Sequence, residues 1–200
     1  MKQKILHLII IFFFLSTNSF SKNLKFTKII DLDKPWGSSF ISNNEIIITE
    51  KSGKIKIVNI KNRNTREINH NLNFLEYGQG GLLDIIYKDG FVWISYTEDR
   101  GNLKTSTSIA KAKFNRKKIF FKNIFQANPP IDSGNHFGSR LAIKDNYIFA
   151  SIGERGQGMI AQDTRSHPGS IIRIHLDGTI PIDNPKFKEK KNWLPEIYQI

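Results

Sequence analysis

The sequence predicts an all-β fold arranged as a β-propeller, and three observations favour it. No stretch beyond the N-terminal apolar segment shows a sustained helical period of apolar residues. Short β-rich runs separated by Asn, Gly, Asp and Lys turns occur instead. The same order of strands and turns then recurs three times, opening near Trp36, Gln79 and Phe137. A four-stranded antiparallel unit repeated about every 40–50 residues is typical of propeller blades.

Each repeated unit has the same predicted parts. It opens with glycine and a small or polar residue, continues through a short strand, and turns at NN, DG or DN. A third strand is expected to begin near Ile55, Ile109 and Ile171, and the segments TREINH and IFFKNIFQ are expected as fourth strands of the first two units. The second strand of each unit leads to a glutamate, with spacings of 48 and 56 residues: Glu50, Glu98 and Glu154. A β-sandwich, the alternative fold, gives no reason for a glutamate to recur at one place.

The N-terminus predicts a secretory signal peptide over residues 1–21. Lys2 and Lys4 precede an apolar run from Ile5 to Leu15, and Ser19 and Ser21 are small residues that suit a cleavage site. The apolar run is too short for a membrane-spanning helix, which needs about 20 residues. An uncleaved membrane anchor is the alternative. We therefore expect residues 22–200 to form the mature chain, in the periplasm or secreted, with no stable membrane insertion after the signal is removed.

Composition excludes several classes of protein. The chain contains no cysteine, which excludes a disulfide scaffold, thiol catalysis and cysteine-ligated zinc. The formal net charge of +12 could indicate a nucleic-acid partner, but such binding needs the charge on one face or helix. Here lysine is scattered through predicted turns such as KSGK, NRKK and KFKEKK. The charge pattern therefore predicts no nucleic-acid partner.

Three blades do not close a propeller, because closure takes about four to eight. The chain ends at LPEIYQI, in a predicted outer strand of the third unit. We therefore expect the 200 residues to be the N-terminal half of a longer propeller domain, truncated, not stably folded alone and inactive by itself.

The residues just before each unit are expected to face one mouth of the central channel. They are Trp36, Gln79 and the pair His136 and Phe137. A neutral imidazole is well suited to removing a proton from an alcohol, and such a base needs a partner on its other nitrogen. Glu154, at the end of the following hairpin, is the candidate partner. The alternatives are a loop histidine bonded to backbone and an exposed turn carboxylate.

Five segments carry a resemblance to a known family. GQGGLLDI, GNHFGSRLAI, SIGERGQG, AQDTRSHPGSIIRIHLDGTIPIDNPKF and PEIYQI occur in the order found in soluble quinoprotein sugar dehydrogenases. From about Lys34 to Ile200 the chain resembles the glucose/sorbosone dehydrogenase family, especially its aldose sugar dehydrogenase branch. The resemblance implies a six-bladed propeller, with about the first three blades present here. It also implies oxidation of an aldose to its lactone in the periplasm, with pyrroloquinoline quinone and calcium as cofactors and a further electron acceptor.

The resemblance also implies roles for individual residues. His136 matches the general base that takes the proton of the anomeric hydroxyl, and Glu154 matches an acid that helps to set the imidazole. Gln79 matches a position beside the substrate. Asn135 stands where glucose-specific members carry aspartate, which favours an aldose-type site. The residues that hold the quinone and the calcium are expected beyond Ile200, so no metal ligand is assigned within this chain.

Two functions of other classes remain open at this stage. One is a non-catalytic periplasmic propeller that binds carbohydrate. The other is a lactone hydrolase, which would need metal-ligating Glu, Asn and Asp residues spread across the blades, and that set is not recognisable in the sequence.

Overall fold

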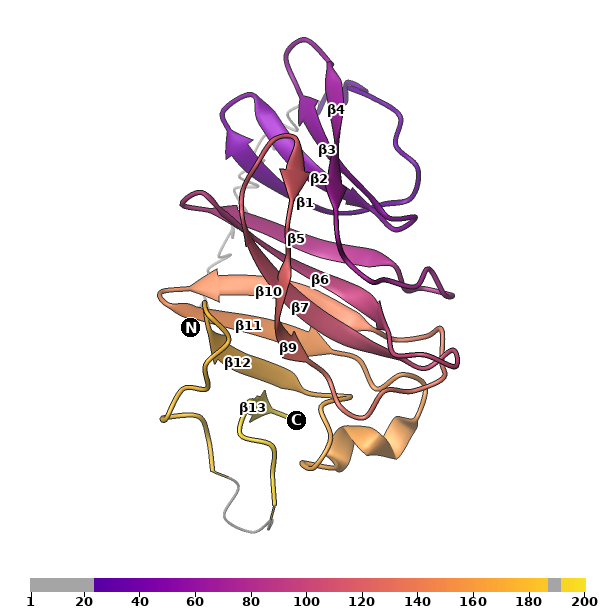
Figure 1. Ribbon diagram of the computed structural model, residues 1–200, viewed down its shortest axis with the longest axis vertical. Helices are drawn as coiled ribbons and strands as arrows, with labels where there is room; N and C mark the ends of the chain where they lie inside the picture. The colour runs from indigo at the N-terminus through magenta and orange to yellow at the C-terminus, as the bar shows by residue number, and fades with distance from the viewer. Residues whose placement is uncertain (1–23, 187–191) are drawn as a thin grey trace, which may run out of the picture.

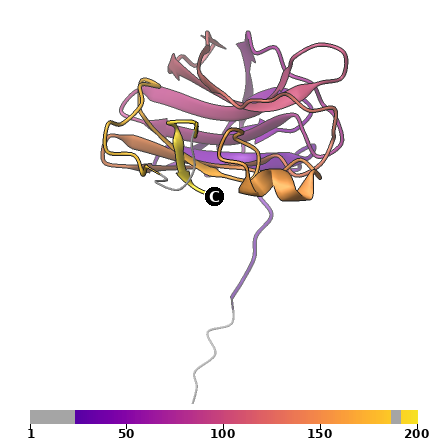
Figure 2. The same ribbon diagram turned by 90° about the horizontal axis from the view of Figure 1, so that it is seen from below.

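The computed structural model describes residues 24–186 and 192–200, and it shows three sheets arranged side by side as blades (Figure 1). The sheets follow one another along the chain, and Figure 2 shows them from below. The predicted all-β architecture is confirmed. The predicted signal peptide, residues 1–21, lies outside the described residues. In the described part of the chain no helix combines the length and the apolar character needed to cross a membrane.

Each sheet is built mainly from consecutive antiparallel strands. The first contains β1 (Pro35–Ser42), β2 (Glu45–Glu50), β3 (Lys54–Asn59) and β4 (Thr65–His70), with the short β8 (Lys118–Ile119) added in parallel to β4. The second contains β5 (Leu82–Lys88), β6 (Phe91–Asp99), β7 (Thr105–Lys113) and β9 (Lys122–Gln126). The third contains β10 (Gly138–Lys144), β11 (Tyr147–Ile152), β12 (Ile171–His175) and β13 (Ile197–Gln199), with a short 3₁₀ helix, η1 (Gly158–Gln162), between β11 and β12.

Two strand predictions need correction. TREINH is β4, as predicted, but IFFKNIFQ is not one strand. Its first residue, Ile119, pairs with the first sheet, while Lys122–Gln126 closes the second sheet beside β7. Ile119 and Phe121 are both buried between these two sheets, which explains the crossing of the chain there. The third strand of the second unit begins at Thr105, ahead of the expected Ile109.

The three glutamates do not all occupy one place in the repeat. Glu98 and Glu154 each lie seven residues after the start of their strand, whereas Glu50 lies five residues after it. Glu50 therefore pairs across the first sheet with Pro35 of β1. At the equivalent position of the second sheet, the residue that pairs with β5 is Tyr96, opposite Leu82. Glu50 and Glu98 are buried rather than exposed turn charges. The repeat holds for Glu98 and Glu154 and fails for Glu50, which lies two residues nearer to the start of its strand.

Alternate residues of the middle sheet serve two different cores. On β6, Val92, Ile94 and Tyr96 pack into the core shared with the first sheet. Trp93, on the opposite face of the same strand, packs into the core shared with the third sheet. This follows from the period of two in a β-strand. The second sheet is therefore the shared wall between its two neighbours.

The innermost strand of each sheet is bulged near its first residues. The register shifts lie between Pro35 and Ser38 in β1, between Leu82 and Ile85 in β5, and between Gly138 and Leu141 in β10. A hydroxyl on the second strand lies opposite each bulge and accepts an N–H that the ladder leaves free. These bonds are 2.9–3.1 Å long and join Gly37 to Thr49, Asp84 to Ser95, and Arg140 to Ser151.

We expect Ile94→Ala to lower the free energy of unfolding by about 2–5 kcal/mol, the usual cost of removing a buried isoleucine side chain. Ile94 is fully buried between the first and second sheets. Chemical denaturation of the protein measures the effect. The matched control is Ile182→Ala, since Ile182 is 94% exposed and should change the same quantity by less than about 0.5 kcal/mol. Equal effects of the two substitutions would contradict the packing described above.

Candidate functional site

His136 lies in the loop that joins β9 of the second sheet to β10 of the third. Its backbone φ is +48°, a left-handed conformation that few residues other than glycine adopt, and Gly138 follows at +69°. The loop thus makes a sharp turn directly before β10. This turn places His136 just before the first residues of the inner strand β10, as the sequence predicted.

The structure brings three of the four predicted site residues into direct contact. The Nδ1 atom of His136 is hydrogen-bonded to Oε1 of Glu154. The backbone N–H of His136 donates to Oε1 of Gln79 at 2.9 Å. The backbone N–H of Gln79 in turn donates to the carbonyl of Gly134 at 2.7 Å. Residues from the second and third sheets therefore hold the histidine through both its ring and its backbone.

Glu154 is suited to orient the imidazole. Its pKa is lowered from the ordinary value, chiefly by the hydrogen bond from His136 and further by backbone N–H groups, including that of Gly156 at 3.1 Å. An ionised carboxylate only accepts hydrogen bonds, so Nδ1 of His136 carries the proton in this pair. The Nε2 atom is then the lone-pair nitrogen. The His136 side chain is 53% exposed, so a ligand can reach the imidazole.

Glycines permit the close approach of the segments that meet at His136. A Cβ at Gly153 would collide with the carbonyl of His136, and a Cβ at Gly78 would collide with the backbone of Gly134. Gly78 also has φ of +58°, which glycine adopts without strain. The glycines in YGQGG and SIGERG therefore shape the site.

Asn135, the fourth predicted residue, directly precedes His136 and is exposed. Its backbone N–H donates to the hydroxyl of Ser133 at 3.2 Å. Its backbone carbonyl accepts a bond of 2.9 Å from Nε of Arg155. Asn135 thus lies at the same edge of the molecule as the imidazole, on a backbone fixed from both sides.

Of the other two residues expected at the channel mouth, Phe137 occupies another place. Phe137 is buried, with its ring packed under the guanidinium of Arg155 at 3.6 Å, so it does not line an open pocket. Trp36 lies within the bulge of β1, and its ring packs against the guanidinium of Arg140 at 4.1 Å. Arg140 also pairs with Asp84 at 3.3 Å. The amide of Gln79 and the imidazole therefore gather as predicted, while the indole packs against Arg140 of the inner strand β10.

Sequence reasoning missed Arg155 and Asp84. Asp84 accepts the backbone N–H of Leu141 at 2.9 Å and so joins the inner strands of the second and third sheets. Arg155 follows Glu154 directly, yet it is only 2% exposed and bonds to the loop that carries His136. The segment SIGERG contains both Glu154 and Arg155, but the sequence offered no sign that its arginine is buried.

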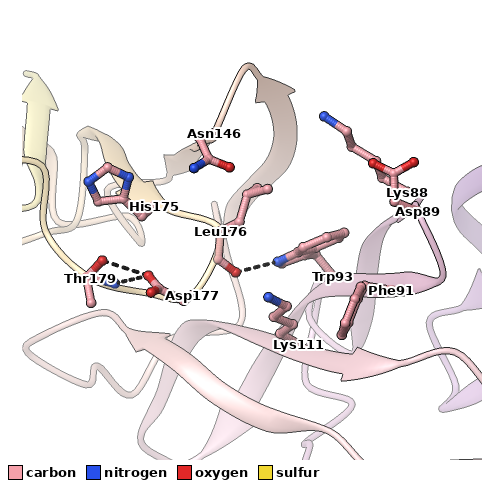
Figure 3. A pocket seen from close by; sticks show the side chains of 10 residues that line it. All are labelled: Lys88, Asp89, Phe91, Trp93, Lys111, Asn146, His175, Leu176, Asp177 and Thr179. Carbon is pink, nitrogen blue, oxygen red and sulfur yellow. Dashed lines mark hydrogen bonds between the residues drawn. The ribbon is translucent and has the colours of Figure 1, made fainter.

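A separate pocket of about 460 Å³ lies at the other end of the second and third sheets (Figure 3). It is lined by residues near the turns that follow β5, β10 and β12, and Lys111 lies over the rings of Phe91 and Trp93. Two of its polar groups bond within the protein: the Trp93 indole donates to the carbonyl of Leu176, and Asp177 accepts from Thr179. None of the predicted site residues lines this pocket.

Within residues 24–186 and 192–200, no three His, Asp or Glu side chains gather as metal ligands would.

We expect His136→Ala to raise the pKa of Glu154 toward its ordinary value of about 4.5, because the bond from His136 is the largest cause of the lowering. A lowered carboxyl pKa contributes stability that is fully present above the ordinary pKa and is lost as the pH falls through the lowered value. An NMR titration of labelled glutamate carboxyls measures the change. The pKa of Glu45, lowered by Arg116, is the internal control and should not move. An unchanged Glu154 pKa would contradict the pairing.

Comparison with known proteins places this site in a family. Residues 32–200 match the family model described as Glucose / Sorbosone dehydrogenase. The chain is 32% identical over 168 residues to the aldose sugar dehydrogenase YliI of Escherichia coli, covering 79% of this chain and 45% of that protein. It is 27% identical over 192 residues to quinoprotein glucose dehydrogenase B of Acinetobacter calcoaceticus, covering 78% and 40%. The chain thus spans about half the length of the curated relatives it matches.

Solved structures agree with this placement. The soluble aldose sugar dehydrogenase of Escherichia coli, in its apo-form, matches with a TM-score of 0.77 at 30% identity, over 83% of this chain and 50% of that chain. The PQQ-bound aldose sugar dehydrogenase of Streptomyces coelicolor matches in fold, with a TM-score of 0.71 at 21% identity over 84% and 50%. The three sheets correspond to about half of the six-bladed propeller of these dehydrogenases. The chain therefore belongs to the glucose/sorbosone dehydrogenase family.

Proposed function

We propose that this protein is a quinoprotein aldose dehydrogenase that oxidises the anomeric hydroxyl of a sugar to a lactone. The observation that carries the proposal is the exposed His136 imidazole, oriented by Glu154 and held beside Gln79. Membership of the glucose/sorbosone dehydrogenase family supports it. Because the chain spans about half the length of its curated relatives, the proposal concerns the activity of the whole protein.

His136 acts as the general base in this proposal. Its Nε2 takes the proton of the sugar hydroxyl, since Nδ1 already donates to Glu154. The carboxylate of Glu154 then stabilises the imidazolium that forms, and its lowered pKa keeps it ionised. The exposed Asn135 and the side-chain amide of Gln79 are suited to bind neighbouring hydroxyls, because an amide both donates and accepts hydrogen bonds.

The described residues fit one side of a quinone site. Pyrroloquinoline quinone, when bound, supplies the acceptor of the hydride. Its carboxylates call for cationic donors, and the largely exposed guanidinium of Arg140 on the inner strand β10 is the candidate donor here. Arg155 is not a candidate, because its N–H groups bond to the protein. The neutral imidazole and amides fit the sugar side of the site.

We further propose calcium as a second cofactor and the periplasm or the exterior of the cell as the location. The first rests on the resemblance to the family alone. The second rests on the predicted signal peptide at residues 1–21.

We expect His136→Ala to lower kcat for aldose oxidation by at least about 10²–10⁴-fold, the range typical of a lost general base. Dye reduction by the full-length protein, loaded with quinone and calcium, measures the rate. His175→Ala is the matched control, because His175 lies in the pocket at the opposite end of the blades. Its rate should match that of the unsubstituted protein.

Full activity of His136→Ala would contradict the assignment of the base. Carbohydrate binding by the loaded, full-length protein without any dye reduction would favour the alternative, a non-catalytic propeller that binds carbohydrate.

A further inference from the structure

Arg155 is the largest of the fully buried side chains in the described part of the chain, and it has an unusual set of partners. No carboxylate lies within ion-pair distance of its guanidinium among the described residues. Burial lowers its pKa to about 10, so the group is still charged at neutral pH. A buried cation without a carboxylate partner is costly unless its N–H groups are satisfied. The contacts that satisfy it therefore show what the residue does.

Those contacts converge on the loop that carries His136. Nε donates to the carbonyl of Asn135 at 2.9 Å, and Nη2 donates to the carbonyl of Ser133. Two further bonds, of 3.1 and 2.8 Å, join the guanidinium to the carbonyl and the hydroxyl of Thr105, the first residue of β7. The second sheet, through Thr105, and the His136 loop therefore share one guanidinium.

The same residue also contacts the loop from two other directions. Its guanidinium lies 3.6 Å from the ring centroid of Phe137, the residue that follows His136. Its backbone N–H donates to the carbonyl of His136 at 3.3 Å. Arg155 thus contacts the residues directly before and after His136, and the backbone of His136 itself. The residue before it, Glu154, holds the imidazole.

We propose that Arg155 is a positioning residue for the base: its guanidinium fixes the backbone of residues 133–137 so that the His136 imidazole meets Glu154 in a single tautomer. This inference rests on the proposed function of His136. Without the guanidinium, the carbonyls of Ser133 and Asn135 lose their donor, and the left-handed conformation at His136 loses its support. A lysine cannot replace it, because one ammonium cannot reproduce the planar, forked set of donors.

The test compares Arg155→Lys with Arg173→Lys in the full-length protein. Arg173 is a matched control: it is also buried, donates to the side chain of Asn184 at 2.6 Å, and packs against the rings of Tyr147 and Tyr198.

The ¹⁵N shifts of labelled histidine report which ring nitrogen of His136 carries the proton, with the signals assigned by their loss in His136→Ala. We expect Arg155→Lys to change the single Nδ1–H tautomer into a mixture and to lower kcat by about 10–10²-fold, the cost of a misplaced catalytic group. Arg173→Lys should do neither.

A second variant covers the case in which Arg155→Lys does not fold. Thr105→Val removes the hydroxyl that accepts from Nη2 and keeps the shape of the side chain. Thr105→Val should also lower the share of the Nδ1–H tautomer of His136, by less than Arg155→Lys does. Unchanged ¹⁵N shifts in a folded Arg155→Lys or Thr105→Val protein would overturn the proposal, even if activity falls, because a purely structural role lowers activity without altering the imidazole.

The two proposals fail separately. If His136→Ala retains activity while Arg155→Lys still shifts the tautomer, the dehydrogenase base is wrong and the positioning role stands. If His136→Ala is inactive while the His136 tautomer is the same in Arg155→Lys as in the unsubstituted protein, the assignment of the base stands and the positioning role is wrong.

Discussion

Two hydroxyl groups, opposite the bulges of β1 and β5, make the contacts on which the arrangement of the sheets at the His136 end depends. Thr49 donates to the carbonyl of Leu83, and Ser95, at the equivalent place in the second sheet, donates to the carbonyl of Ser139 at 2.6 Å. Each hydroxyl thus accepts a bond within its own sheet and donates one to the next. Since Ser139 lies three residues after His136, this contact sets the backbone from which the histidine loop departs.

The two ends of the sheets are held by different forces. Along β6, Val92, Trp93 and Ile94 are apolar and pack into the cores on either side, whereas Ser95 and Thr97, nearer to the His136 end, bond to backbone. Apolar burial is non-directional and supplies most of the free energy of folding. A buried hydrogen bond adds only about 1 kcal/mol but fixes direction. The apolar residues therefore hold the sheets together, and the hydroxyls align them where the site is built.

The sequence was sufficient to predict the strands, the repeat and the meeting of His136, Gln79 and Glu154, because alternation and turn residues are local signals. It misplaced Glu50, which lies two residues nearer to the start of its strand than Glu98 and Glu154 do, because composition leaves no mark of that offset. The division of IFFKNIFQ between two sheets is decided by the burial of Ile119 and Phe121, a tertiary effect. The roles proposed for the site residues rest on chemistry and family resemblance, beyond what geometry alone supplies.

Arg155 escaped prediction because its partners are backbone carbonyls, which every residue possesses and no sequence pattern identifies. The turn that contains it explains how adjacent charges come to act apart. Arg155 has φ of +59° and Gly156 of +75°, so the chain reverses just after Glu154. The carboxylate meets the exposed imidazole, while the guanidinium enters the interior beneath the same loop. One left-handed turn thus presents the Glu154 carboxylate to the ring of His136 and the Arg155 guanidinium to the backbone carbonyls of Ser133 and Asn135. These hydrogen bonds are why a buried cation without a carboxylate partner among the described residues is tolerated here.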